Sequence, residues 1–478
     1  MEGTLIRLKG KGVLFISLLY LYLPLVVFSV TWIRLPIGIC CVLVAGGLIY
    51  SIYKNFNRKS SLVIEIKPVL ILLFGVILLA IGGLCGWGGW FPQTADWVKH
   101  NAILNDLIKL SWPVYYKNAA NPSMLTYNLS AYIIPAVCGK FFHSFYAGEV
   151  CMYIWLELGV ILTLLNMFIS TKACTWKKQL LVVAIFIVFN GCLIMGQQIY
   201  ELASSFSSQD IRWMIDSDNN PLFQYKSNAT VMRWIMPQIS SIWLICSIWY
   251  GNRNEFQDYV GLMLPAFFSS VLATVGIVYI AIVCLISYAL ETKDTCHVLK
   301  RAFSPCNLVG FFTIGIMLLI YYSGNAFSEK PQDISFHFLL PNLLCLCCFI
   351  LTEVGLYCIL IYKDNKHNGL YWGSLLLLLT LPFVHMGKYN DLQIDANVPA
   401  MFLIMMAIDI YLIKNSNSFA AGVLIALLTF SSFNSFKEYK EPFETNSTIV
   451  PHIIGDCSYT LEAWSDLSLD RSIPVIHK

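Results

Sequence analysis

Charge is scarce in this chain of 478 residues. Asp, Glu, Lys and Arg make up 12% of the sequence, about half of the roughly 25% found in typical soluble domains. Hydrophobic residues account for 57%, above the usual range of about 45–50%. So little charge and so much apolar surface exclude a disordered chain and argue against a soluble globular one. We therefore expect a protein whose solvent is the lipid bilayer.

The sequence also lacks the features typical of nucleic-acid-binding and zinc-binding proteins. Its net charge of +3 gives no basic surface for phosphate backbones, so we expect no nucleic acid partner. Most of the 16 cysteines fall within apolar runs, and none has the spacing with histidine that zinc sites use. What remains to interpret is a series of long apolar runs.

Apolar runs of about 20 residues, the length that crosses a bilayer as a helix, recur along the chain. We predict spans at 12–31, 36–53, 68–86, 145–169, 179–196, 233–250, 306–323, 338–361, 369–386, 397–413 and 418–433. The run 259–290 contains Pro265 and Gly276 and predicts either a tight pair of spans or a re-entrant hairpin. The expected fold class is all-α: a polytopic transmembrane bundle of about 11 to 13 spans with long outer loops.

Basic residues accumulate in every second loop of this topology. They are Arg7, Lys9 and Lys11; Lys54, Arg58, Lys59 and Lys67; Lys172, Lys177 and Lys178; Lys293, Lys300 and Arg301; and Lys363 and Lys366. Lys and Arg in short loops are retained in the cytoplasm. The pattern therefore predicts a multi-pass protein of the cell membrane, with the N-terminus inside and the C-terminus outside.

This topology divides the chain into three parts. Residues 1–67 hold two N-terminal spans, 68–433 form a catalytic-type core, and 434–478 form a polar outer tail. The core has two long outer loops, 87–144 and 197–232, which are rich in Trp, Tyr, Asp and Asn. Since the inner loops are short and basic, we expect the protein to act at the outer face.

Residues 95–110 of the first outer loop have the periodicity of a short helix at the membrane interface. Thr94 is placed to cap it, and Trp112-Pro113 discourages its continuation. One arc of the helix is apolar and contains Trp97, Ile103, Leu104, Leu107, Ile108 and Leu110. The polar remainder contains Lys99, Asn101, Asn105, Asp106 and Lys109. We expect the polar side to face away from the core.

Asp96 and His100 break this pattern because they lie one turn apart within the apolar arc. Burying a carboxylate and an imidazole is costly unless they have partners, which suggests a functional site. Alternatively, Asp96 interacts with the helix N-terminus, and His100 is a satisfied interfacial residue. A carboxylate at headgroup depth suits sugar transfer from a lipid phosphate to a hydroxyl. That reaction needs a base for the hydroxyl proton and a cation for the departing phosphate.

Three basic residues on the predicted outer side are candidates for that cation: Arg233, Lys140 and Lys388. The alternative for each is that its side chain simply reaches the lipid headgroups. Glu149 and Glu157 fall inside the predicted span 145–169. Ionisable residues at that depth usually face a cavity or a partner, and a transporter would use them equally well.

Through these residues and several others, the chain resembles uncharacterised bacterial multi-pass proteins related to the GT-C glycosyltransferases. The similar positions are Asp96, His100, Asn101, Leu107, Trp112-Pro113-Val114, Leu125, Tyr127, Pro135-Ala136, Gly139-Lys140, Arg233-Trp234, Pro237-Gln238, Pro382, Gly387, Asn390-Asp391-Leu392 and Val398-Pro399. The resemblance covers about 68–413 and implies a GT-C-like fold, a polyprenyl-phosphate-linked donor and a catalytic Asp on the first large outer loop. In one departure, Asp395 stands where the family pattern has an Arg, which removes a candidate phosphate clamp.

We therefore predict an inverting membrane glycosyltransferase with Asp96 as general base. Its expected partners are a lipid-linked sugar donor and membrane lipids, and the sequence leaves a divalent metal ion open as cofactor. The residues expected to bind substrate are His100, Asn101, Lys140, Arg233, Gln238, Lys388 and Asp391. The alternative is a lipid flippase or secondary transporter that uses Glu149, Glu157 and the 259–290 segment. A polymerase or ligase of lipid-linked saccharides is a third possibility.

Overall fold

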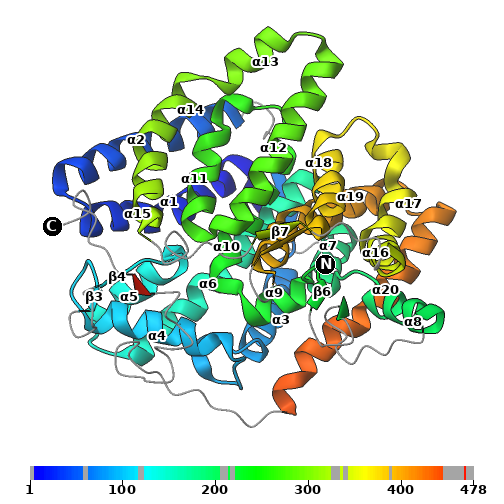
Figure 1. Ribbon diagram of the computed structural model, residues 1–478, viewed down its shortest axis with the longest axis horizontal. Coiled ribbons are helices and arrows are strands. Elements are labelled where there is room, and N and C mark those ends of the chain that lie inside the picture. The colour runs from blue at the N-terminus through cyan, green and yellow to red at the C-terminus, as the bar shows by residue number, and fades with distance from the viewer. Residues whose placement is uncertain are drawn as a thin grey trace.

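A computed structural model describes residues 5–56, 63–116, 123–204, 214–215, 221–324, 334–336, 343–386, 390–444 and 468–469. Within these residues, eight helices are long and apolar enough to cross a membrane, or nine if one bent pair counts as a span. All strands there are short, with at most four residues each. The chain is an all-α polytopic helical bundle (Figure 1), as predicted.

The eight long helices or helical runs coincide with predicted apolar segments. They are α1 (Gly10–Trp32), α2 (Leu35–Phe56), α6 (Phe145–Thr171), α12 (Val271–Thr292), the run Thr295–Ser323, the run Leu343–Asn365, α19 (Asp391–Lys414) and the run Phe419–Phe443. The first run comprises α13 (Thr295–Ala302), α14 (Pro305–Gly310), η4 (Phe311–Gly315) and α15 (Ile316–Ser323). The second comprises α16 (Leu343–Ile350), η7 (Leu351–Gly355) and α17 (Leu356–Asn365). The third is α20 (Phe419–Lys440) with η9 (Glu441–Phe443), so the predicted polar tail from 434 begins as helix.

Three other predicted spans form shorter helices. They are α3 (Pro68–Leu84), α10 (Met236–Gly251) and α18 (Gly369–Thr380), in place of 68–86, 233–250 and 369–386. Helix α3 has 17 residues, at the lower limit of the usual length of about 17 to 25 residues, whereas α10 with 16 and α18 with 12 are shorter. Their crossing of the membrane remains a prediction.

The structure corrects two predicted segments. Residues 179–196 do not form one continuous helix but a bent pair, α7 (Trp176–Val188) and α8 (Leu193–Ser204), at an angle of 44°. The 259–290 run divides at Ser270 into α11 (Tyr259–Ser269) and the full-length α12. The Ser270 side chain caps α12 by accepting from the Ala273 N–H. At 1.5 Å per residue α11 is about 16 Å long, so this run is one short helix and one full span.

The most buried span is α19, which lies at the centre of the bundle. It packs against α6, α7, α10, α12, α17 and α18, and Figure 1 shows α12, α18 and α19 side by side. A Cβ at Gly276 of α12 would lie 2.3 Å from the Ala396 carbonyl oxygen, so only glycine permits this approach. Large apolar side chains stay exposed on outer helices, for example Leu43, Leu290 and Phe419. These surfaces are suited to contact with membrane lipids.

Some of the short strands pair segments that are distant in sequence. Strand β1 (Ile6–Lys9) pairs antiparallel with β2 (Val63–Ile66), and Gln179 Nε2 donates to the Glu65 carbonyl at 3.0 Å. Three of the predicted basic loops therefore meet at one end of the bundle. The other strands are β3 (Tyr115–Tyr116), β4 (Ser123–Leu125), β5 (Met214–Ile215), β6 (Pro221–Phe223), β7 (Ile334–Phe336), β8 (Val384–Met386) and β9 (Ser468–Leu469). Which side of the membrane that end faces remains a prediction.

Candidate functional site

Helix α4 (Asp96–Lys109) forms where residues 95–110 predicted a helix. The prediction that its polar side is exposed is wrong, because Asn101, Asn105 and Asp106 are all buried. Asn101 Nδ2 donates to Gln93 Oε1 at 2.7 Å, and the Tyr116 hydroxyl donates to Asp106 Oδ2 at 2.5 Å. Because α5 (Ser130–Phe141) and α6 also cover it, α4 is an internal helix.

The N-terminus of α4 differs from the predicted cap. Ala95 occupies the N-cap position without a side-chain hydrogen bond, and the buried Thr94 hydroxyl has no hydrogen-bond partner within the described residues. Asp96 is the first helical residue and is half-buried. Its carboxylate therefore lies at the positive end of the helix dipole, which was one of the two explanations that the sequence left open.

Asp96 belongs to a cluster of charged side chains from three segments, which we call the charged cluster. Its members are Asp96 and Lys99 of α4, Lys226 of the loop before α9 (Asn228–Trp234), and Asp391 and Asp395 of α19. Lys226 interacts electrostatically with all four other members, and Lys99 interacts with Asp96 and Asp391. The fold thus joins helix α4 to the start of the central helix α19.

Hydrogen bonds to α19 hold the Lys226 loop in place. The backbone N–H of Gln224 donates to Gln393 Oε1 at 3.1 Å, and that of Lys226 donates to Asn397 Oδ1 at 3.1 Å. These two acceptors are one helical turn apart, so the extended loop lies along the helix. Ser227 then caps α9 by accepting from the Thr230 N–H at 3.0 Å. The position of Lys226 is therefore fixed on both sides.

The two lysines of the charged cluster have different electrostatic environments. Burial lowers the pKa of Lys226, and Asp395 and the other carboxylates only partly oppose this effect. Burial also acts to lower the pKa of Lys99, but Tyr127, Asp96 and Asp391 outweigh it, so this pKa is raised. Lys99 therefore keeps its positive charge at neutral pH, whereas Lys226 loses its proton more readily than an exposed lysine.

Tyr127 connects the charged cluster to α10. Lys99 donates a hydrogen bond to the Tyr127 hydroxyl, and its Nζ lies 5.7 Å from the ring centroid. Gln238 Nε2 donates to the same hydroxyl at 2.5 Å. Gln238, predicted to bind substrate, is thus linked to Asp96 through Tyr127 and Lys99.

His100 has protein partners for both ring nitrogens. Nδ1 lies 2.5 Å from the Tyr132 hydroxyl, and Nε2 lies 3.2 Å from the Trp234 carbonyl oxygen. Burial, with the nearby charge of Lys99, lowers the pKa of His100 to about 3. The ring is therefore neutral, with Nε2–H donating to the carbonyl and Nδ1 accepting from Tyr132. This arrangement agrees with the alternative of a satisfied histidine, and substrate contact by His100 remains a prediction.

Lys140 is too far from Asp96 for the predicted phosphate role beside it. Its ammonium donates to the carbonyl of Ile108 at 3.2 Å and to that of Leu110, at the C-terminus of α4. Asp96 is at the other end of this helix, about 20 Å away at 1.5 Å per residue. Lys140 therefore stabilises the last turn of α4, where a cation interacts favourably with free carbonyls.

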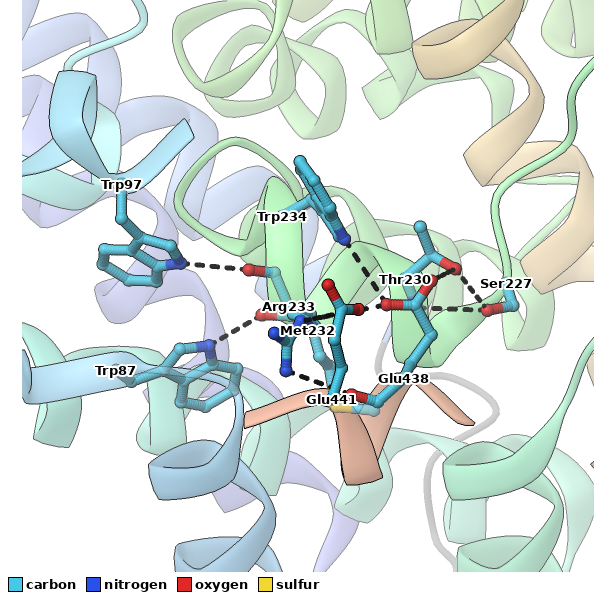
Figure 2. A network of polar contacts seen from close by, with 9 residues as sticks. All are labelled: Trp87, Trp97, Ser227, Thr230, Met232, Arg233, Trp234, Glu438 and Glu441. Carbon is cyan, nitrogen blue, oxygen red and sulfur yellow. Dashed lines mark hydrogen bonds and ion pairs between the residues drawn. The ribbon is translucent and has the colours of Figure 1, made fainter. Parts of the chain in front are cut away.

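Arg233 is also occupied by the protein itself (Figure 2). Its Nη1 donates to the Glu438 carbonyl at 3.1 Å, and its Nε lies 3.6 Å from Glu441 Oε2 and 3.9 Å from Glu438 Oε2. The indole of Trp97 donates to the Arg233 carbonyl at 3.0 Å and approaches from the side away from Glu438. Arg233 therefore joins α9 to the end of α20 instead of facing the charged cluster.

Two predicted substrate-binding residues remain, Asp391 and Lys388, together with the possible metal ion. Asp391 begins α19 and belongs to the charged cluster. Lys388 lies outside the described residues. Within the described part of the chain, no three His, Cys, Asp or Glu side chains come together as a ready metal site.

Sequence reasoning missed Lys99 and Lys226 as candidate cations. Lys99 follows Asp96 by three residues, a spacing that places both on one side of a helix, yet its exposed position on the helical projection favoured a solvated lysine. Nothing in the local sequence around Lys226 indicates its contact with α19. Asp395 stands where the family pattern has an Arg, which suggested that a phosphate-binding cation is missing. In the structure it interacts instead with Lys226, a cation from another segment.

The sequence matches no family model, no curated protein and no solved structure. The resemblance to GT-C-related proteins therefore rests on the residues that carry it. Function has to be inferred from the charged cluster and from the position of Asp96 within it.

Proposed function

We propose that this protein is a membrane glycosyltransferase that uses a polyprenyl-phosphate-linked sugar donor at the outer face of the membrane. The observation that carries this proposal is the interaction of the half-buried Asp96 with two lysines, Lys99 and Lys226. A base and cations in one cluster supply the two groups that sugar transfer from a lipid phosphate requires.

In this proposal Asp96 removes the proton from the acceptor hydroxyl as the hydroxyl oxygen bonds to the anomeric carbon. The bond from that carbon to the phosphate oxygen breaks, and its electron pair leaves with the phosphate. Lys99 and Lys226 balance the growing charge on this leaving group. They take the role that the sequence assigned to Arg233 and Lys140, whose side chains bind protein groups.

Asp395 fits the same scheme despite its departure from the family pattern. Its carboxylate interacts with Lys226 and so supports a cation supplied by another segment. Asp391 and Gln238 are then substrate-positioning residues. Asp391 interacts with Lys99 within the charged cluster, and Gln238 donates a hydrogen bond to Tyr127, which binds Lys99. His100 and Asn101 do not contact substrate in this scheme. Their hydrogen bonds to Tyr132 and Gln93 hold α4 in place.

Donor hydrolysis tests this proposal without knowledge of the acceptor. The full-length protein in liposomes is given a panel of radiolabelled polyprenyl-phosphate monosaccharides, and release of the sugar is measured. We expect release from at least one donor and a loss of at least about 100-fold in Asp96→Asn, the scale of a general base. Asp364→Asn, at an exposed position bonded to Asn415, is the matched control. Full activity in folded Asp96→Asn refutes the assignment.

A second comparison tests the cations on a single helix. Lys99→Gln removes the lysine next to Asp96, whereas Lys109→Gln removes an exposed lysine in the last turn of α4. We expect donor release to fall in the first variant only. Equal activity in both variants contradicts a phosphate-binding role for Lys99.

The alternative function is a lipid flippase or secondary transporter. Glu157 favours it, because this carboxylate is buried within span α6 and its Oε1 has no hydrogen-bond partner among the described residues. Buried acids in spans often line transport pathways. Lipid or solute flux into proteoliposomes that is lost in Glu157→Gln and unchanged in Asp96→Asn supports the transporter. Incorporation of label into a second glycan lipid instead indicates a polymerase or ligase.

A further inference from the structure

The break between α7 and α8 is an unusual feature inside the bundle. Residues 189–192 separate the two helices, whose axes differ by 44°. Other segments satisfy several backbone groups there: the Tyr357 hydroxyl donates to the Asn190 carbonyl at 3.0 Å, and the Cys192 N–H donates to the Thr352 carbonyl at 3.1 Å. Non-helical backbone is tolerated within membrane proteins where protein groups bind it in this way.

The segment opposite this break is itself irregular. The π-helical turn η7 interrupts the span Leu343–Asn365. Glu353 lies within it, ten residues after Leu343 and twelve before Asn365, which places it near the middle of the span. Single π-helical turns within longer helices are frequent at functional sites. Two irregular segments are thus in contact with each other.

Glu353 packs directly against the α7–α8 break. Its side chain is 1% exposed, and a Cβ at Gly191 would lie 2.2 Å from Glu353 Oε2 and 2.6 Å from Oε1. A Cβ at Gly196 of α8 would lie 2.3 Å from Thr352 Oγ1. The two glycines therefore let the broken span approach η7 closely enough to bury the carboxyl group.

No positive charge faces this carboxyl group within the described part of the chain. The titratable side chains that interact with it are Cys192 at the break, Tyr225 of the loop before α9 and Tyr357 of α17. All three types of side chain are ordinarily neutral at pH 7. Glu353 Oε1 also has no hydrogen-bond partner among the described residues.

We propose that Glu353 is a proton-binding site in the membrane interior, and that release of its proton opens the α7–α8 break. An ionised carboxylate without a partner is strongly disfavoured in an apolar interior, so the neutral acid is the form that fits this arrangement. When the acid releases its proton to water, the charge left against Gly191 requires water or backbone N–H groups as new partners. The broken backbone supplies such groups, as discontinuous membrane helices do at ion sites. This inference does not depend on sugar transfer.

Infrared spectroscopy of the full-length protein in lipid nanodiscs tests the site. We expect a carbonyl stretch of a protonated carboxylic acid that converts to carboxylate bands as the pH rises. Glu353 contributes one component of this conversion, taken as the difference between wild type and Glu353→Gln in a fixed frequency window. This component is absent in Glu353→Gln and moves in frequency in Glu353→Asp, which keeps a titratable group if the glutamine variant folds poorly. Glu157→Gln, also buried, and Glu291→Gln, at an exposed ion pair, retain it. Its persistence in Glu353→Gln, or its dependence on sodium instead of pH, overturns the proposal.

Hydrogen exchange of the peptide containing residues 186–197 tests the coupling to the break. After correction for the intrinsic pH dependence of exchange, we expect faster exchange at alkaline pH in the wild type. Glu353→Gln, which mimics the protonated acid, is expected to exchange slowly at every pH, whereas Glu157→Gln behaves as the wild type. The same pH response in wild type and Glu353→Gln refutes the coupling.

Discussion

The backbone N–H of Lys226 donates to Oδ1 of Asn397 at a distance of 3.1 Å. This bond joins the loop before α9, which the sequence predicts to be outside, to the central helix α19. It also holds the Lys226 side chain where it interacts with Asp395, which precedes Asn397 by two residues. Asn397 therefore positions one of the two proposed phosphate-binding cations without facing substrate itself.

Replacement of Asn397 by Ala is expected to displace this loop. The buried Lys226 N–H then has no partner, so the free energy of unfolding should fall by about 1–3 kcal/mol. Thermal unfolding in detergent measures the loss. Asn415→Ala, at a half-buried residue that bonds to the exposed Asp364, is the control and should change stability by less than about 0.5 kcal/mol. Equal effects in the two variants contradict the positioning role.

A double-mutant cycle tests the contact between Lys226 and Asp395. Lys226→Gln and Asp395→Asn should each reduce donor hydrolysis and stability, because each removes the opposite charge that acts most strongly on the other buried group. In the double variant we expect less than the sum of the stability losses, with a coupling free energy of about 0.5–3 kcal/mol. Additive effects show that the two side chains do not interact.

The network around Arg233 predicts unequal effects of its two acidic partners. Glu438 is 5% exposed and Glu441 is 35% exposed at the side chain. Glu438→Gln should lower the free energy of unfolding by about 3 kcal/mol or more, because it removes a buried partner of a buried arginine. Glu441→Gln should cost less than about 1 kcal/mol, as for exposed pairs. Chemical unfolding of both variants in detergent measures the contrast, and equal losses contradict it.

His100 predicts a pH dependence of stability. Its pKa is about 3 in the folded protein, whereas the ordinary pKa of a histidine, which applies to the unfolded chain, is 6.5. The unfolded chain therefore binds more protons than the folded protein between these two values. The stabilisation is complete above about pH 6.5 and is lost as pH falls toward 3, by at most about 1.4 kcal/mol per pH unit. Unfolding midpoints from neutral to acidic pH measure this slope.

His100→Gln should flatten this profile, because the glutamine does not titrate. His367→Gln changes a histidine whose side chain is 73% exposed, and it should leave the profile as in the wild type. A wild-type stability that does not change between pH 7 and the onset of carboxylate protonation contradicts the assignment.

The sequence alone predicted the all-α membrane bundle and the residues of α4 because both depend on local patterns. Long apolar runs can only be buried in lipid as helices, and the periodicity of 95–110 specifies a helix wherever it packs. The same pattern did not show that α4 is internal. That property depends on α5, α6 and Tyr116, which approach from other parts of the chain.

The roles of the charged residues were decided by tertiary structure. Sequence position made Lys140 and Arg233 reasonable phosphate ligands, but the fold brings carbonyls to the first and Glu438 to the second. It brings Lys226 to Asp395 instead, across 169 positions of sequence, through the contact with Asn397. Hydrophobicity acts on each segment separately, whereas the pairing of buried charges depends on which segments become neighbours. For that reason the helical bundle could be predicted from the sequence, whereas the charged cluster could not.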